Sequence, residues 1–119
     1  MKIAFFSDIH ANLPAFEAFL KDVDQVNPDV IYCLGDLVGY NVWPNEIVNE
    51  IRKSRIPTIM GNHEEALLTP PEKEDLSSNK GLTKLLLSKE NLDFLVNLPR
   101  QMTLTYANSS GKFNLLLVH

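Results

Sequence analysis

Short apolar runs alternate with amphipathic stretches through the first half of the chain. The runs at residues 2–6, 30–34 and 56–60 are apolar over nearly their whole length, which is typical of strands covered on both faces. The stretches between them place apolar residues at helical spacing: Phe16, Phe19, Leu20 and Val23, then Ile47, Val48 and Ile51. The order β-α-β-α-β predicts a parallel sheet with right-handed crossovers, and therefore an α/β fold.

Caps and helix-breaking residues set the expected ends of these elements. Asn12, with a proline two residues later, opens the first helix, and Asn27 followed by proline stops it. Pro44 opens the second helix. Pro57 lies within the third apolar run, which predicts an edge or strand-start position there because proline cannot donate to a sheet ladder.

The middle of the chain is less regular. Residues 69–81 are rich in proline, serine, asparagine and charge, and predict a loop that is either a lid or a solvated connection. Residues 82–88 predict a short helix. Ser88 is then a suitable N-cap for a further helix through Asn97.

The last residues predict a β-hairpin. Residues 102–106 alternate between apolar and polar, residues 108–111 form a turn, and residues 113–118 are a continuous apolar strand that ends directly before His119. A run this apolar is typical of a central strand, but this one lies at the end of the chain, and chain termini favour the surface. We therefore expect residues 1–119 to be a single domain that is truncated at its C-terminal side.

The composition is that of a soluble globular protein. Of the 119 residues, 45% are hydrophobic and 22% charged, and the formal net charge of −4 disfavours nucleic acid or an anionic membrane as the main partner. Cys33 is the only cysteine, which excludes an intrachain disulfide and a cysteine-based zinc motif and suits a reducing compartment. No segment has the roughly 20 apolar residues of a membrane span. We expect a cytoplasmic protein, and these features do not set its oligomeric state.

Side chains that can bind metal follow each of the three predicted parallel strands. Asp8 and His10 follow the first, Asp36 the second, and Asn62 and His63 the third. Taken alone, each has an ordinary explanation as a helix cap, a strand-to-helix turn or an exposed turn histidine. The carboxyl ends of parallel strands meet at one edge of a sheet, however, and clustered carboxylates repel one another unless a cation lies between them. The joint pattern therefore predicts a metal site.

Two divalent ions explain this set better than one. Asp36 can bridge them, with Asp8 and His10 on one side and Asn62 and His119 on the other. Paired ions clamp a phosphoryl group and lower the pKa of a shared water. Mixed nitrogen and oxygen ligands leave manganese, iron and zinc open, and of these we expect manganese.

The same residues resemble the signature of the calcineurin-like metallophosphoesterases. That signature is Asp-x-His, then Gly-Asp, then Gly-Asn-His with a following acid, then His and a late Gly-x-His. Its blocks in this chain are Asp8-Ile9-His10, Gly35-Asp36, Gly61-Asn62-His63-Glu64 and Val118-His119. Residues 7–14 and 33–40 resemble a bacterial and archaeal branch of small cytoplasmic phosphoesterases, and the resemblance covers essentially the whole chain.

The resemblance implies a four-layer α/β/β/α sandwich, of which this chain holds the N-terminal portion. It implies five metal ligands: Asp8 and His10 on one ion, Asn62 and His119 on the other, and Asp36 between them. His63, with the bridging Asp36, would be catalytic, because a histidine there can protonate a leaving group. The substrate would be a small phosphorylated molecule.

The chain departs from the family pattern at several positions. Ala11 stands where the family usually has glycine, and Glu64 where this branch commonly has aspartate. The residues after Asp36 lack the Asp-Arg-Gly continuation of the protein phosphatases, which disfavours that activity. The late Gly-x-His segment, which would add one histidine to each metal, is not in this chain.

Three hypotheses follow from these observations. The first is a metal-dependent phosphoesterase that hydrolyses phosphodiester or phosphomonoester bonds of small molecules. The second is a truncated or degenerate fragment that binds metal or phosphate without turnover, and the missing ligands favour it. The third, a Rossmann-like nucleotide-binding domain, is disfavoured because no Gly-x-Gly-x-x-Gly follows a strand. Tyr40 and Trp43, just past Asp36, either flank the substrate or pack against the following helix.

Overall fold

The computed structural model describes residues 1–69 and 76–119. Its elements in chain order are β1 (Ile3–Phe6), α1 (Leu13–Val26), β2 (Val30–Cys33), α2 (Pro44–Lys53), α3 (Asn62–Ala66), α4 (Asn79–Leu86), α5 (Lys89–Val96), β3 (Met102–Asn108) and β4 (Gly111–Leu117). The sequence therefore places most helices and strands correctly. Within the described ranges, no helix has the length and apolarity that crossing a bilayer requires.

Of the three predicted parallel strands, the first two pair as expected, but the third forms only a single bridge. β1 and β2 are parallel, with Ile3 opposite Val30 and Phe6 opposite Cys33. The run at residues 56–60 pairs with β2 through a single isolated bridge, between Cys33 and Thr58. Its Pro57 accepts from the Cys33 N–H at 3.0 Å but has no N–H of its own to return, so a regular strand does not form.

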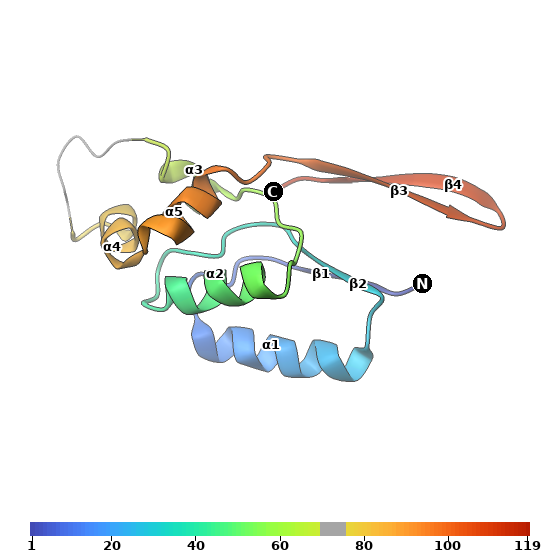
Figure 1. The fold of residues 1–119 in the computed structure, drawn as a ribbon, viewed down its shortest axis with the longest axis horizontal. Coiled ribbons are helices and arrows are strands. Elements are labelled where there is room, and N and C mark those ends of the chain that lie inside the picture. The colour runs from blue at the N-terminus through green and yellow to red at the C-terminus, as the bar shows by residue number, and fades with distance from the viewer. Residues whose placement is uncertain (70–75) are drawn as a thin grey trace.

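Both faces of the parallel pair are covered, by different layers. Helices α1 and α2 lie on one side of β1 and β2, and the β3–β4 hairpin lies on the other (Figure 1). Along β2, Ile31 and Cys33 contact the helix-side core, whereas Val30, Tyr32 and Leu34 contact the hairpin-side core. The described residues thus form three layers, α/β/β, in the order expected for the sandwich.

The helices begin and end close to their predicted caps. The Asn12 side chain accepts from the Ala15 N–H at 3.1 Å, and Asn27 ends α1 in the left-handed conformation with φ 49°. In α2, the three predicted core residues Ile47, Val48 and Ile51 are fully buried.

The predicted middle loop is too long at its C-terminal end. Helix α4 begins at Asn79 rather than at residue 82, because the Ser78 side chain accepts from the Gly81 N–H at 3.0 Å and caps it. Residues 70–75 of the predicted loop lie outside the described residues, so its role as a lid stays a prediction. Ser88 caps α5 as expected, accepting from the Asn91 N–H at 3.2 Å, and this helix ends at Val96.

The hairpin forms where it was predicted, but its second strand is not a buried central strand. Met102 pairs with Leu117 and Asn108 with Gly111 across a two-residue turn. Phe113 and Leu116 remain 42% and 60% exposed. Leu116 alternates with Leu115 and Leu117, which pack towards β2, and so lies on the opposite face of the strand. The turn end of the hairpin extends past the end of β1 and β2 (Figure 1), and the described residues leave that end uncovered.

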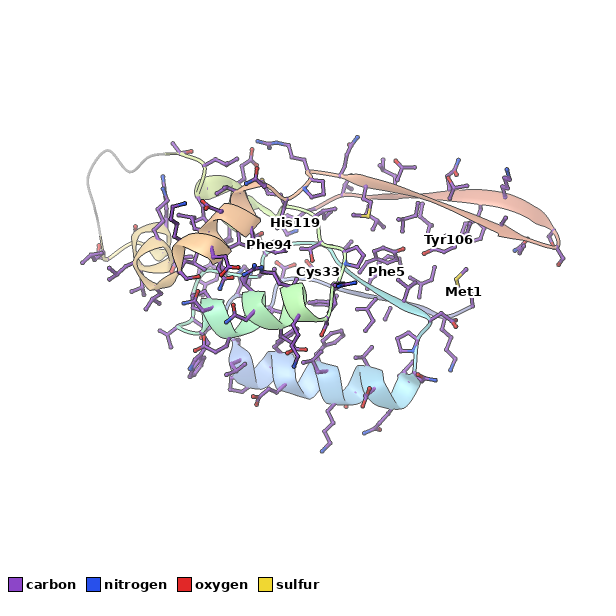
Figure 2. The ribbon with its side chains drawn as sticks, in the orientation of Figure 1. Met1, Phe5, Cys33, Phe94, Tyr106 and His119 are labelled. Atoms are coloured by element: carbon purple, nitrogen blue, oxygen red, sulfur yellow. The ribbon has the colours of Figure 1, made fainter. Side chains whose placement is uncertain are left out.

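The near half of the hairpin is fixed to the parallel strands. Side chains from both sheets meet between them (Figure 2), and the Tyr32 and Tyr106 hydroxyls are 2.8 Å apart. The hydrogen bond with Tyr106, added to burial, raises the pKa of Tyr32 to about 12. The Tyr32 phenol therefore stays neutral over the whole physiological range.

The lone cysteine provides a test of the core. Cys33 is 1% exposed, and burial raises the pKa of its thiol to about 12. Only the thiolate reacts with disulfide reagents. At pH 8 we therefore expect Cys33 of the native protein to be labelled no faster than the protein unfolds. In guanidinium chloride, Cys33 should be labelled at once. A Ser110→Cys variant in the exposed hairpin turn should react at once at its new thiol. Prompt labelling of native Cys33 by Ellman's reagent would contradict the buried placement.

Candidate metal centre

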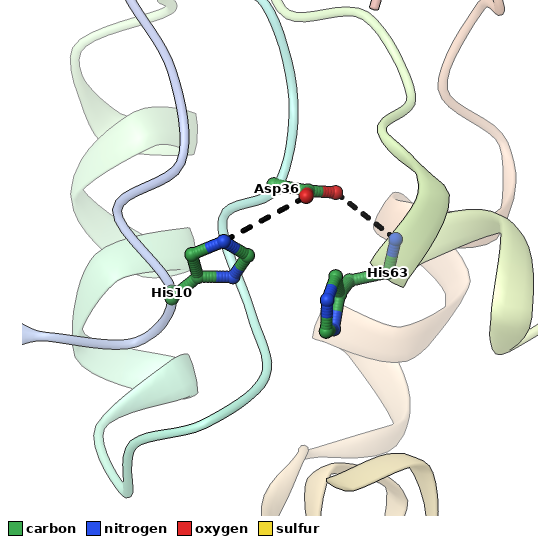
Figure 3. A group of neighbouring side chains, drawn as sticks. All are labelled: His10, Asp36 and His63. Carbon is green, nitrogen blue, oxygen red and sulfur yellow. Dashed lines mark hydrogen bonds and ion pairs between the residues drawn. The ribbon is translucent and has the colours of Figure 1, made fainter.

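The structure brings all the predicted site residues to one place. They follow β1 (Asp8 and His10), follow β2 (Asp36), open α3 (Asn62 and His63) and follow β4 (His119). Figure 3 shows the centre of this arrangement, with the His10 and His63 rings beside the Asp36 carboxylate. Segments that are more than a hundred residues apart in the sequence therefore converge at one sheet edge.

The loops after β1 and β2 are joined in a strained conformation. The parallel ladder continues beyond the strands, since the Asp8, His10 and Ala11 N–H groups donate to the carbonyls of residues 35–37 at 2.7–3.0 Å. Asp8, His10, Ala11 and Asp36 all have φ between 49° and 60°. This left-handed region is uncommon for residues other than glycine, and strain of this kind collects at functional sites. Ala11 keeps the turn even though the family usually has glycine there.

The His10 ring presents a lone pair to carboxylates. Its Nδ1 lies 3.0 Å from the Val38 carbonyl oxygen, and since a carbonyl only accepts, Nδ1 carries the proton. In the neutral tautomer with this proton, Nε2 holds the lone pair, and it lies 3.4 Å from Asp8 Oδ1 and 3.7 Å from Asp36 Oδ2. A neutral imidazole oriented in this way meets only other acceptors.

His119 repeats the arrangement from the second sheet. Its Nδ1 donates to the Leu34 carbonyl at 2.8 Å. Its Nε2 faces Asn62 Oδ1 at 2.9 Å and Asp36 Oδ2 at 3.4 Å. Metal-bound histidines characteristically donate their other ring N–H to a carbonyl or carboxylate. Two rings that both direct a lone pair at oxygen acceptors fit a bound cation, which is the group that would satisfy all of them.

Asp36 occupies the shared position. Its side chain is nearly buried, and its Oδ1 accepts from the His63 backbone N–H at 3.0 Å (Figure 3). Its Oδ2 is the oxygen that faces His10 and His119. One carboxylate oxygen is therefore used by the protein and the other is directed at both ring nitrogens, as a bridging ligand requires.

Two groups of three residues have ligand atoms within 4.8 Å of one another. They are His10 with Asp36 and His63, and Asp8 with Asp36 and His119. Both contain Asp36, which agrees with two ions that share it. The partners differ from the predicted sets, because Asp8 groups with His119, and His63 groups as a ligand candidate. The assignment of each residue to one ion, and of His63 to catalysis, stays a prediction.

The surroundings of Asp8 favour its ionised form. The Ser7 hydroxyl donates to its carboxylate, and His119 and His10 lie nearby. The Ser7 hydrogen bond holds the pKa of the Asp8 carboxyl below its ordinary value. Asp8 is consequently ionised at neutral pH and adds negative charge to the site.

The sequence reasoning missed the role of Glu64, which it treated only as the acid of the family signature and as a departure from aspartate. Its fully buried carboxylate accepts four backbone N–H bonds: from Asp36 and Gly61 on Oε2 at 2.8 and 2.9 Å, and from Leu37 and Val38 on Oε1 at 2.8 and 3.2 Å. Burial raises the pKa of this carboxyl, and the N–H donors act against that rise. The signal was present as a capping box, in which an acid at the third helical position accepts from the N-cap.

The close approach of the loops also requires glycine at position 61. A Cβ there would lie 2.2 Å from Asp36 Oδ1 and 2.4 Å from the Asp36 nitrogen. Asp36 therefore packs directly on the Gly61 backbone, which explains why the Gly-Asn-His block begins with glycine.

Known proteins resemble the chain over most of its length. The family model described as calcineurin-like phosphoesterase matches residues 1–118. The uncharacterized protein MJ0912 of Methanocaldococcus jannaschii is 41% identical over 102 residues, which are 82% of this chain and 42% of that protein.

Two crystal structures resemble the fold. A metallophosphoesterase from Sphaerobacter thermophilus is 36% identical with a TM-score of 0.72, over 86% of this chain and 42% of that one. The hypothetical protein PH1004 from Pyrococcus horikoshii OT3 has a TM-score of 0.77 over 95% of this chain and 53% of that one, and at 20% identity it supports the fold alone. The chain thus spans about half the length of these relatives.

Replacing Glu64 tests whether its carboxylate holds the site loops. In Glu64→Gln, an amide NH₂ takes the place of one oxygen and leaves two backbone N–H groups without an acceptor. We expect the free energy of unfolding to fall by roughly 2–6 kcal/mol, because each of these two unsatisfied buried donors costs roughly 1–3 kcal/mol. The neighbouring Glu65, which is exposed and paired with Arg100, is the control: Glu65→Gln should change stability little. Equal stabilities of the two variants in urea unfolding would contradict the role of Glu64.

Proposed function

Since the chain belongs to the calcineurin-like phosphoesterase family, we propose that it carries the centre of a metal-dependent phosphoesterase. Its substrates would be small phosphorylated molecules with a phosphodiester or phosphomonoester bond. The chain covers 42% of its relative MJ0912, so the activity of a protein of that full length is part of the proposal.

One observation supports the proposal above the others. The Nε2 lone pairs of His10 and His119 and the Oδ2 atom of Asp36 are directed at the same space, 3.4–3.7 Å apart. Such a set of acceptors is electrostatically unfavourable by itself and becomes favourable around cations. The protein maintains it with strained loops and a buried carboxylate, and a purely structural site has no need of such an arrangement.

The proposed reaction divides the work between bound cations and the chain. When bound, paired divalent ions would activate a water molecule and offset negative charge on the phosphoryl oxygens. Asp36 fixes the spacing of the ligands, and the Val38 and Leu34 carbonyls fix the orientation of the two rings. His63, next to Asp36 and His10, protonates the leaving oxygen. The ligand chemistry suits manganese, iron or zinc, and we propose manganese.

The setting of the reaction is also a proposal. The net charge of −4 and the single cysteine, buried and unpaired, favour a cytoplasmic protein that does not bind nucleic acid. A small phosphorylated substrate is compatible with this charge, since bound cations reverse the local field.

Hydrolysis assays test the proposal. We expect the chain to hydrolyse p-nitrophenyl phosphate or bis(p-nitrophenyl) phosphate when Mn²⁺ is added, and not in the presence of a chelator. Asp36→Asn should lower the rate at least about a hundredfold, since even residues behind the ligands change activity 10–100-fold. Asp22→Asn, on the exposed side of α1, is the matched control and should keep the wild-type rate. Equal rates for the wild type and Asp36→Asn would refute the proposal.

The length of the chain favours a second candidate function. Relatives are about twice as long, and the late Gly-x-His block would supply further ligands, so this chain alone could bind metal or phosphate without turnover. Calorimetry with Mn²⁺ and inorganic phosphate distinguishes the two. Two bound ions per chain together with hydrolysis support the enzyme, whereas substoichiometric or weak binding without hydrolysis supports the fragment.

A further inference from the structure

We propose that Tyr40 is a positioning residue that holds the His63 ring in the orientation from which it protonates the leaving group. The inference rests on the proposed function and adds a residue to it. Tyr40 lies in the segment between β2 and α2, four residues after Asp36. Its ring contacts that of His10, one of the predicted metal ligands.

Tyr40 forms a three-ring cluster with His10 and His63. The ring centroids of Tyr40 and His10 are 4.8 Å apart with an interplanar angle of 76°, and those of Tyr40 and His63 are 4.8 Å apart at 57°. The two histidine rings are 4.7 Å apart at 71°. Each ring touches both others at angles favourable for aromatic pairs, so the His63 ring has an aromatic neighbour in Tyr40 and another in His10.

Tyr40 is not where core packing would place it. Its side chain is 64% exposed and its φ is 66°, a backbone conformation that is unfavourable for a residue with a Cβ. The expectation that it packs against the following helix is replaced by these contacts with the two histidines. A strained and exposed aromatic side chain gains little stability from burial, which leaves its contact with the site as the feature to be explained.

Gly39 also confines the His63 ring. A Cβ on Gly39 would lie 2.3 Å from His63 Nδ1, so the ring packs directly on the glycine backbone, where φ is 89°. The main chain of His63 is fixed by its N–H bond to Asp36 Oδ1 at 3.0 Å. Only the side-chain torsions remain free, and the Tyr40 ring and the Gly39 backbone restrict them.

The segment that carries Tyr40 is itself anchored to the site. The Asn41 side chain donates from Nδ2 to the His10 carbonyl at 2.9 Å, and its backbone N–H donates to the Gly39 carbonyl at 2.9 Å. The Trp43 N–H donates to the Ala11 carbonyl at 3.3 Å. These bonds connect residues 39–43 to the loop after β1, so Tyr40 is held against the histidines by the backbone on both sides of it.

The chemical consequence depends on the leaving group. As the ester bond from phosphorus to the leaving oxygen breaks, that oxygen takes the proton of His63, the water oxygen forms the new bond to phosphorus, and the proton lost by water restores the histidine. If His63 is misoriented, hydrolysis slows most for esters with a poor leaving group, because such a group needs the proton in order to leave. p-Nitrophenolate leaves without protonation, and its esters should be insensitive to the orientation of His63.

Matched esters test the role of Tyr40. Against a phenyl ester we expect Tyr40→Ala to lose about tenfold in kcat, part of the 10²–10⁴-fold that a general acid supplies. Against the corresponding p-nitrophenyl ester the loss should be under about threefold. Tyr40→Phe, which keeps the ring, should recover most of the phenyl-ester rate. Val42→Ala, an exposed apolar residue of the same segment, should change neither rate. Equal losses of Tyr40→Ala on both esters would overturn the proposal and leave the phosphoesterase function intact.

A measurement without turnover separates this inference from the proposed function. Proton NMR of the chain should show a nuclear Overhauser contact between the His63 ring and the Gly39 α-protons, and the chain has only three histidines to assign. We expect this contact to weaken in Tyr40→Ala and to persist in Val42→Ala. If it persists unchanged in Tyr40→Ala, Tyr40 does not position His63, whether or not the wild type hydrolyses either ester.

Discussion

The buried carboxylate of Glu64 is the interaction on which the site depends. It accepts N–H groups from three consecutive residues after β2 and from Gly61, and so fixes the loop of Asp36 against the start of α3. Val38, whose nitrogen is held in this way, offers its carbonyl to His10 Nδ1. The position of one glutamate thereby helps to fix, through two hydrogen bonds, the His10 ring whose Nε2 faces Asp8 and Asp36.

The site combines backbone strain with electrostatic repulsion, and the stability of the surrounding packed core compensates for both. Left-handed residues in the loops after β1 and β2 cost of order 1–3 kcal/mol each, and the ligand oxygens and lone pairs repel one another. The compensation comes from the helix-side core, in which Phe16, Ile47 and Ile51 are almost fully buried. Such a site is pre-organised for a cation, since little rearrangement of the chain would be needed on binding.

The sequence predicts features that depend on local pattern and misses those that depend on distant contacts. Helical spacing identified α1, α2 and α5, and the residues after each strand identified the ligands. The prediction of a third strand was wrong. Pro57 could be recognised in the sequence, but its effect on pairing with β2 depends on the strand register, which the sequence does not give. The role of Glu64 depends on N–H groups 26–28 residues away, and the ring contacts of Tyr40 depend on a loop conformation that has no periodic signature. For the same reason, the sequence could not show that β4 would extend beyond the parallel strands.

The second sheet connects packing to chemistry. His119 follows β4, and its ring reaches the Leu34 carbonyl across 85 residues of sequence. That reach depends on the hairpin lying over β2, which the Tyr32–Tyr106 hydrogen bond and the apolar contacts of Leu117, Met102 and Leu104 maintain. The packing of the hairpin on β2 therefore serves two purposes. It buries apolar surface, and it sets the distance between His119 and Asp36. Any change that shifts the hairpin by one residue would move His119 to the opposite face, so the fold and the ligand set cannot vary independently.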